Sequence, residues 1–173
     1  IAALKESSAP QQAQINIPII KPEAGSKEAV VPVPAVMPES NTLAVPFTPQ
    51  APTGNWDALH NEACEEASAI MANAFLIGNK TINLPATQVE EEITGLTKWQ
   101  DENLGYHKDS TAAETAAMIT GFYGLKTKLI ENYSLSDIKK ELNLGHIIIL
   151  PVNGQEISNP YYKQPGPIYH MLV

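Results

Sequence analysis

Apolar positions follow a helical spacing through much of the chain, and one such stretch surrounds Cys64. Its apolar face collects Ala63, Ala67, Ile70, Met71, Ala74 and Phe75. This spacing predicts a helix, with Asn61 as its N-cap and Gly78 at its end. Cys64 lies on the same face as Ala67 and Met71, because side chains three and seven positions apart lie on one side of a helix.

A second helix is predicted from Pro85 to about Asn103. Its apolar face is marked by Val89, Ile93 and Leu96. The run Glu90–Glu92 falls in the N-terminal half, where the helix dipole favours negative charge. We expect these glutamates to form a solvated face rather than a metal site.

Two more helices are predicted farther along the chain. Thr111-Ala112-Ala113-Glu114 is a capping-box sequence that begins a third helix, which ends near Gly124. Ser134 or Ser136 begins a short fourth helix, which ends at Gly145.

Strand patterns gather toward the C-terminal end. Residues Lys126–Ile130 alternate polar and apolar side chains, and His146–Val152 is a β-branched run typical of a buried strand. Asn153–Pro167 predicts a loop, and Ile168 begins the next strand. Because helices come first and strands last, the pattern indicates an α+β fold.

Residues 1–42 differ in composition from the rest. They contain six prolines and no aromatic residue, since the first aromatic is Phe47. Prolines at this density favour extended chain, so we expect a flexible linker over 1–42 and a folded domain over 43–173. A short edge strand at Ile15–Ile20 is the alternative. Such a linker is typical of an extracellular or cell-surface protein that is tethered through it.

Charge and hydropathy narrow the possible partners. The chain has 19 acidic and 11 basic residues and a formal charge of −8. Without a Lys/Arg cluster, nucleic acid and anionic membrane surfaces are not expected partners. No apolar run approaches the roughly 20 residues of a membrane span. Because the chain begins at Ile1 and ends in an apolar run, we expect the protein to continue beyond both ends.

The chemistry that stands out is a single cysteine near a helix start. Cys64 has no second cysteine for a disulfide and no neighbouring ligands for zinc. A helix N-terminus favours a thiolate, so Cys64 is either a buried small apolar residue or a nucleophile.

Four histidines compete as the base that such a nucleophile needs. His60 is expected to be exposed or capping, and His107 lies in a polar loop. His146 lies at the start of a strand, and His170 lies within an apolar strand. Residue chemistry alone leaves the choice open.

The order of residues resembles a family. Val45-Pro46-Phe47, Gln50, Asn55-Trp56 and Cys64-Glu65-Glu66-Ala67-Ser68-Ala69-Ile70-Met71 resemble the front of the C39-like cysteine peptidases. The later stretch from Gly145-His146-Ile147-Ile148-Ile149 to His170-Met171-Leu172-Val173 resembles their second half. The resemblance covers about Leu43 to Val173. Many members carry glycine after the cysteine, where this chain has Glu65.

This resemblance implies a papain-like α+β fold, in which a helix bearing the cysteine packs on a mostly antiparallel sheet bearing the histidine. It implies Cys64 as nucleophile, His170 as general base and Gln50 as an oxyanion-hole donor. The family also places an Asp or Asn, which orients the histidine, on a later strand beyond Val173.

We therefore expect a monomeric cysteine peptidase that cleaves peptide or protein substrates without a cofactor. Aromatic side chains near the predicted site are Trp56, Tyr161 and Tyr162, which are candidates to line the substrate groove. Trp56 has an alternative role in packing the front loop against the first helix. The alternative function is a papain-like module that binds peptides or cell-wall material without turnover.

Overall fold

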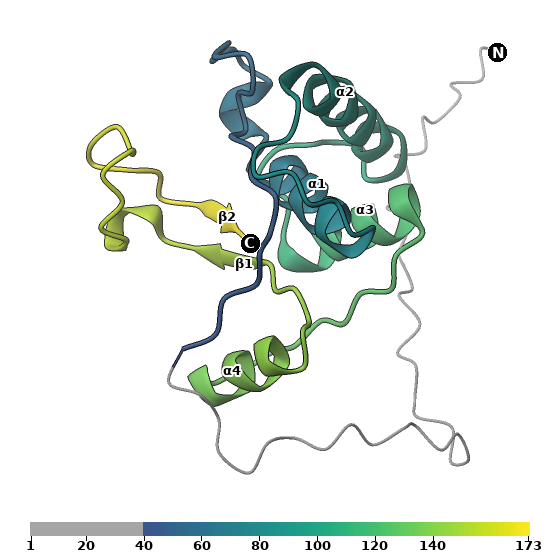
Figure 1. Cartoon of the computed structure of the whole chain (residues 1–173). Helices are drawn as coiled ribbons and strands as arrows, with labels where there is room; N and C mark the ends of the chain where they lie inside the picture. Colours follow the sequence, from purple (N-terminus) through teal and green to yellow (C-terminus); the bar gives the residue numbers. More distant parts are fainter. Residues whose placement is uncertain (1–39) are drawn as a thin grey trace, which may run out of the picture. The chain divides into compact units, whose positions relative to one another are not determined.

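The computed structural model describes residues 40–173, which form four α-helices and two short strands (Figure 1). Nearly all of the predicted 1–42 linker, including the alternative strand at Ile15–Ile20, lies outside the described residues. No helix in the described part of the chain is long and apolar enough to cross a membrane.

Helix α1 (Cys64–Leu76) contacts α2, α3 and β2. Its N-cap is Ala63, and a 3-10 helix, η1 (His60–Glu62), precedes it. The prediction of Asn61 as N-cap is wrong, because the Asn61 side-chain amide instead donates to the Asp57 carbonyl at 2.7 Å. The predicted end is confirmed. Gly78 adopts φ 77°, where a side chain would be strained, and its N–H donates to the Phe75 carbonyl.

Helices α2 (Ala86–Asn103) and α3 (Ala112–Tyr123) confirm the predicted spans. Thr111 and Glu114 form the predicted capping box, and Gly124 ends α3 in the left-handed region. Helix α1 packs against both, and their facing apolar side chains form the core. The largest apolar side chains that are fully buried here are Ile70, Val89, Ile93, Leu96 and Met118. Burying a side chain of this size contributes about 1.5–3 kcal/mol.

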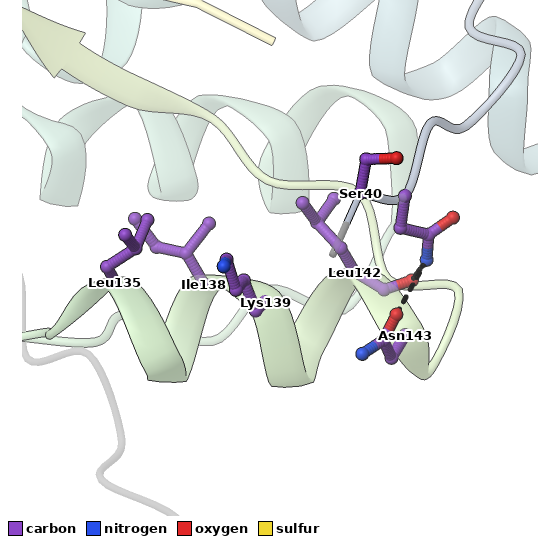
Figure 2. A pocket seen from close by; sticks show the side chains of 7 residues that line it. Ser40, Leu135, Ile138, Lys139, Leu142 and Asn143 are labelled. Atoms are coloured by element: carbon purple, nitrogen blue, oxygen red, sulfur yellow. Dashed lines mark hydrogen bonds between the residues drawn. The ribbon is translucent and has the colours of Figure 1, made fainter. Parts of the chain in front are cut away.

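Helix α4 (Leu135–Asn143) begins at the predicted Ser134 cap but buries none of its residues. Three apolar side chains, Leu135, Ile138 and Leu142, line a hollow of about 230 Å³ (Figure 2). The Asn41 amide bridges one end of it, donating to the Leu142 carbonyl and the Asn143 side chain. None of the predicted catalytic residues lines this hollow.

Strands β1 (Leu150–Val152) and β2 (His170–Leu172) pair antiparallel, with Val152 opposite His170. The predicted strand at Lys126–Ile130 is wrong, and residues 146–149 of the next one are not strand either. A strand needs a hydrogen-bonded neighbour. Only three residues of β2 pair with β1, so the ladder covers Leu150–Val152 and not residues 146–149. The loop between the strands contains a short 3-10 helix, η2 (Gly154–Glu156).

The predicted α+β arrangement is confirmed at a coarse level. The described residues are mostly helical, and the helix that begins with Cys64 packs against the antiparallel pair that carries His170. This packing brings the two predicted catalytic segments into one neighbourhood.

Candidate active site

Cys64 is the first residue of α1, and its side chain is buried. The sulfur lies 3.0 Å from Oε2 of Glu65 and is placed to donate its proton to that carboxylate. The position follows from the apolar face of the helix, since the following residue on that face, Ala67, is also buried.

The surroundings of Cys64 favour the protonated thiol. Burial raises the pKa of Cys64 most, and the nearby Glu65 carboxylate raises it further. The backbone of Met171, which lies near the sulfur, acts in the opposite direction and lowers the pKa. Met171 directly follows His170 on β2. The sulfur therefore lies against the backbone of the strand that carries the predicted base.

Glu65 and Glu66 both lie inside the protein, each with 1% of its surface exposed. They point inward because α1 is packed against α2, α3 and β2, which leaves its first turn no solvent face. Burial raises the pKa of both carboxyls, that of Glu66 to about 8. The thiol thus adjoins two buried acids: Glu66, which keeps its proton at neutral pH, and Glu65, whose carboxylate accepts the hydrogen bond from the thiol.

His170 lies on β2 and packs edge-on against Tyr162, with the ring centroids 5.4 Å apart. Burial lowers the pKa of His170 below its usual 6.5. At neutral pH the imidazole is therefore uncharged, as a general base must be before it accepts a proton.

Strand β2 is fixed to the helical layer by hydrogen bonds on either side of His170. The Ser68 hydroxyl on α1 donates to the Met171 carbonyl at 3.3 Å, and the Tyr169 hydroxyl donates to the Ser110 carbonyl at 2.5 Å. No local pattern indicates this contact, because Ser110 and Tyr169 are 59 positions apart. Burial raises the pKa of Tyr169 most, and the nearby Glu65 carboxylate raises it further.

Gln50 lies in the loop before η1. Its side-chain amide donates to the carbonyls of His60, at 2.8 Å, and of Asn61, at 3.2 Å. Both amide protons therefore have backbone acceptors. A substrate oxygen would have to displace one of these acceptors before Gln50 could donate to it.

The aromatic candidates differ in exposure. The Trp56 side chain is 60% exposed and Tyr161 is 93% exposed, whereas Tyr162 is half-buried on His170. The alternative role of Trp56, packing the loop against α1, is wrong because the indole faces solvent. Trp56 and Tyr161 are free to contact a partner.

The other three histidines all pair with carboxylates. His107 lies 2.8 Å from Asp101, and His146 lies 2.6 Å from Glu141 on the surface. His60 is buried, with its ring between Asp57 and Glu90. The expectation that His60 is exposed or capping is therefore wrong. Asp57 lies three positions before His60, so the local sequence could have indicated this pair. Glu90 lies on α2, thirty positions after His60, and no local pattern indicates that contact.

Residues 40–173 contain no cluster of three or more His, Cys, Asp or Glu side chains that could hold a metal ion. Glu90 and Glu92, expected on a solvated face, instead bind His60 and the Tyr123 hydroxyl, respectively. Comparison of the chain with protein-family models, curated proteins and solved structures found no match.

Replacing Glu65 with glutamine should speed the reaction of Cys64 with iodoacetamide by about tenfold or more near neutral pH. The substitution removes the negative charge closest to the sulfur, so the thiolate forms more readily. Alkylation of the native protein, followed by mass spectrometry, measures the rate.

Glu66→Gln is the matched control for this substitution. Glu66 is equally buried but has the weakest of the effects that raise the thiol pKa. We expect it to change the rate less than Glu65→Gln. Equal rates in Glu65→Gln and the unaltered protein would contradict the assigned influence of Glu65.

Proposed function

We propose that this chain carries the nucleophile and general base of a papain-like cysteine peptidase that is secreted or held at the cell surface. One observation carries the proposal: the N-terminal end of the Cys64 helix packs against the strand of His170. The two residues are far apart in sequence, and nucleophilic catalysis by cysteine needs a base that reaches the thiol. The packing supports this pairing because it puts the strand of His170 beside the Cys64 end of α1.

In the proposed reaction, His170 accepts the thiol proton as the Cys64 sulfur attacks the carbonyl carbon of the scissile bond. The carbon–nitrogen bond then breaks, and His170 gives the proton to the leaving amine. Water attacks the carbonyl carbon of the resulting thioester and loses a proton to His170. The carbon–sulfur bond then breaks, His170 returns the proton to the Cys64 sulfur, and the acid is released.

The carbonyl oxygen gains negative charge during both attacks and needs donors. The backbone N–H of Cys64 is one candidate, because amides in the first turn of a helix have no acceptor within the helix. The Gln50 side chain is the second. Trp56, Tyr161 and Tyr162 are the proposed contacts for the peptide on either side of the scissile bond.

The electrostatics favour a particular starting state. A raised thiol pKa and a lowered imidazole pKa mean that both groups are uncharged at rest. His170 would then act as a true general base during attack, rather than as the imidazolium of a preformed ion pair.

A peptide carrying an electrophilic group, such as a vinyl sulfone, tests the proposal. Because the chain has one cysteine, a single adduct on the native protein reports Cys64 directly. We expect stoichiometric labelling of the full-length protein, a much slower reaction in His170→Gln and none in Cys64→Ala.

The non-catalytic binding module remains the second candidate, because Cys64 is buried and both Gln50 amide protons are occupied. It predicts the opposite result: labelling only after denaturation, with peptide binding unchanged in Cys64→Ala. That outcome would reject the peptidase.

A further inference from the structure

His60 joins the front loop to helix α2 through both of its ring nitrogens. Nδ1 lies 2.8 Å from Oδ1 of Asp57, and Nε2 lies 2.7 Å from Oε2 of Glu90. The His60 side chain is 6% exposed, whereas the side chains of Asp57 and Glu90 are 44% and 28% exposed, so the ring is shielded from water and its partners face solvent in part. A neutral imidazole has one N–H, whereas two carboxylate partners require two donors. The geometry therefore fits a doubly protonated ring.

The two carboxylates are held in place by further donors. Asn55 donates to Oδ2 of Asp57 at 2.9 Å, and Thr53 donates to Oε1 of Glu90 at 3.0 Å. Oδ1 of Asp57 also accepts the backbone N–H of His60. We call these five residues, Thr53, Asn55, Asp57, His60 and Glu90, the His60 clasp.

The His60 clasp is connected by hydrogen bonds to Gln50, the candidate oxyanion-hole donor. The carbonyl of His60 accepts the Gln50 amide at 2.8 Å, and the neighbouring Asn61 carbonyl accepts it at 3.2 Å. The position of Gln50 thus depends on where η1 is held, and the ring of His60 ties η1 to α2. Trp56 lies in the same loop, between Asn55 and Asp57.

We propose that His60 is a positioning residue that fixes Gln50 and the Trp56 loop for catalysis by being clamped, in its charged form, between Asp57 and Glu90. The part that concerns catalysis rests on the peptidase function proposed above. The clamping itself does not.

The charge state makes the clasp sensitive to pH. Burial disfavours the imidazolium, but the hydrogen bonds and charges of Glu90 and Asp57 outweigh burial and raise the pKa of His60 above 6.5. The hydrogen bonds that Asp57 accepts from His60 lower the pKa of the Asp57 carboxyl. Among the described residues, these two carboxylates are the charged groups in contact with the ring.

The direction of the pH effect follows. The stabilisation from His60 is complete below pH 6.5 and is lost as the pH rises through the raised pKa of the folded protein. The stabilisation from Asp57 is present above pH 3.8 and is lost as the pH falls through the lowered pKa of Asp57 in the folded protein. We therefore expect the loop to be held at weakly acidic pH and to loosen on the alkaline side.

Two measurements on the full-length protein test the proposal. Nitrogen-15 NMR of the histidine rings should show both nitrogens of His60 protonated at pH 6, with a midpoint above 6.5. In a Trp99→Phe background, Trp56 fluorescence should change with the same midpoint. Glu90→Gln should move that midpoint downward and lower kcat for peptide cleavage by about tenfold to a hundredfold, since small misplacements of catalytic groups cost this much.

His146→Gln is the matched control, because it removes a histidine–carboxylate pair from the surface. It should leave both the fluorescence midpoint and kcat unchanged. A His60 midpoint at or below 6.5, or Trp56 fluorescence unaffected by Glu90→Gln, would overturn the clasp even if the peptidase stands. If the clasp titrates as expected but Cys64→Ala retains full cleavage, the peptidase and the catalytic role of the clasp fail, whereas the clamping survives.

Discussion

Replacing Cys64 with alanine should lower kcat for peptide cleavage by about 10⁴-fold or more, because no other residue in the chain can form the thioester. Replacing His170 with glutamine should cost a similar amount. Glutamine is polar and of comparable size but cannot accept the thiol proton. Steady-state cleavage of a peptide library by the full-length protein, read by mass spectrometry, measures both losses.

The double variant separates a catalytic pair from two independent residues. If Cys64 and His170 act as one unit, Cys64→Ala combined with His170→Gln should be no slower than either single variant. Independent contributions would multiply instead. The pH profile adds a further check, since the rate should fall on the acidic side as His170 becomes protonated, below its usual 6.5.

Tyr162→Phe is the matched control for His170. The phenyl ring keeps the edge-on contact with the imidazole but removes the hydroxyl, which has no hydrogen-bond partner among the described residues. We expect it to retain most of the activity, because the ring that is proposed to contact the peptide stays in place. A loss as large as that of His170→Gln would mean that the Tyr162 hydroxyl takes part in the reaction, and full activity in Cys64→Ala would reject the thioester mechanism.

The helices could be predicted because their signals are local. The capping boxes at Thr111 and Ser134, and the left-handed glycines at Gly78 and Gly124, set helix ends from a few neighbouring residues. The start of α1 is the exception. Asn61 has the side chain of a cap, but its amide contacts Asp57, and this choice depends on how the whole front loop is folded.

The strands and the site depend on residues far apart in the sequence. Lys126–Ile130 alternates like a strand, but alternation does not supply a partner to pair with. The inward direction of Glu65 depends on α2, α3 and β2, which cover the first turn of α1. The burial of His60 depends on Glu90, thirty positions later. These contacts are decided by tertiary packing, which the local pattern does not encode.

For Cys64, the local sequence predicted the position in the helix but not the chemical surroundings of the thiol. Its place at the start of an apolar helix face followed from spacing, and so did the expectation that a thiolate would be favoured there. In the structure, burial and Glu65 outweigh the helix terminus and keep the thiol protonated. The proposed nucleophile would therefore depend on its proposed base, His170, at the moment of attack more than on the helix dipole.

Replacing Glu66 with glutamine should stabilise the folded domain at alkaline pH and weaken its pH dependence. Glu66 is almost fully buried, and neither of its carboxyl oxygens has a hydrogen-bond partner among the described residues. Burial raises the pKa from 4.5 to about 8, so the folded state favours the uncharged acid. Oε1 of Gln100, a buried acceptor, also lacks a partner, and a protonated Glu66 can supply a donor in this region.

The raised pKa of Glu66 sets how the free energy of unfolding changes with pH. The unfolded chain releases this proton near pH 4.5, whereas the folded protein holds it until about pH 8. Stability is therefore complete below 4.5 and falls as the pH rises through 8, by on the order of 3–5 kcal/mol at most. Glutamine has no proton to lose, so urea unfolding at pH 5 and at pH 8.5 should differ less in Glu66→Gln than in the unaltered protein.

Glu91→Gln is the matched control. It makes the same chemical change at a side chain that is exposed on α2. It should leave the free energy of unfolding within about 0.5 kcal/mol at both pH values. The alkaline loss in Glu66→Gln should not vanish, because His60 also loses its stabilising proton as the pH rises above 6.5. Combining Glu66→Gln with Glu90→Gln, which removes one of the two carboxylates that hold the His60 proton, should flatten the remaining slope. A slope that is unchanged by Glu66→Gln would mean that the Glu66 carboxyl is ionised in the folded protein and that the first turn of α1 holds a buried charge beside Cys64.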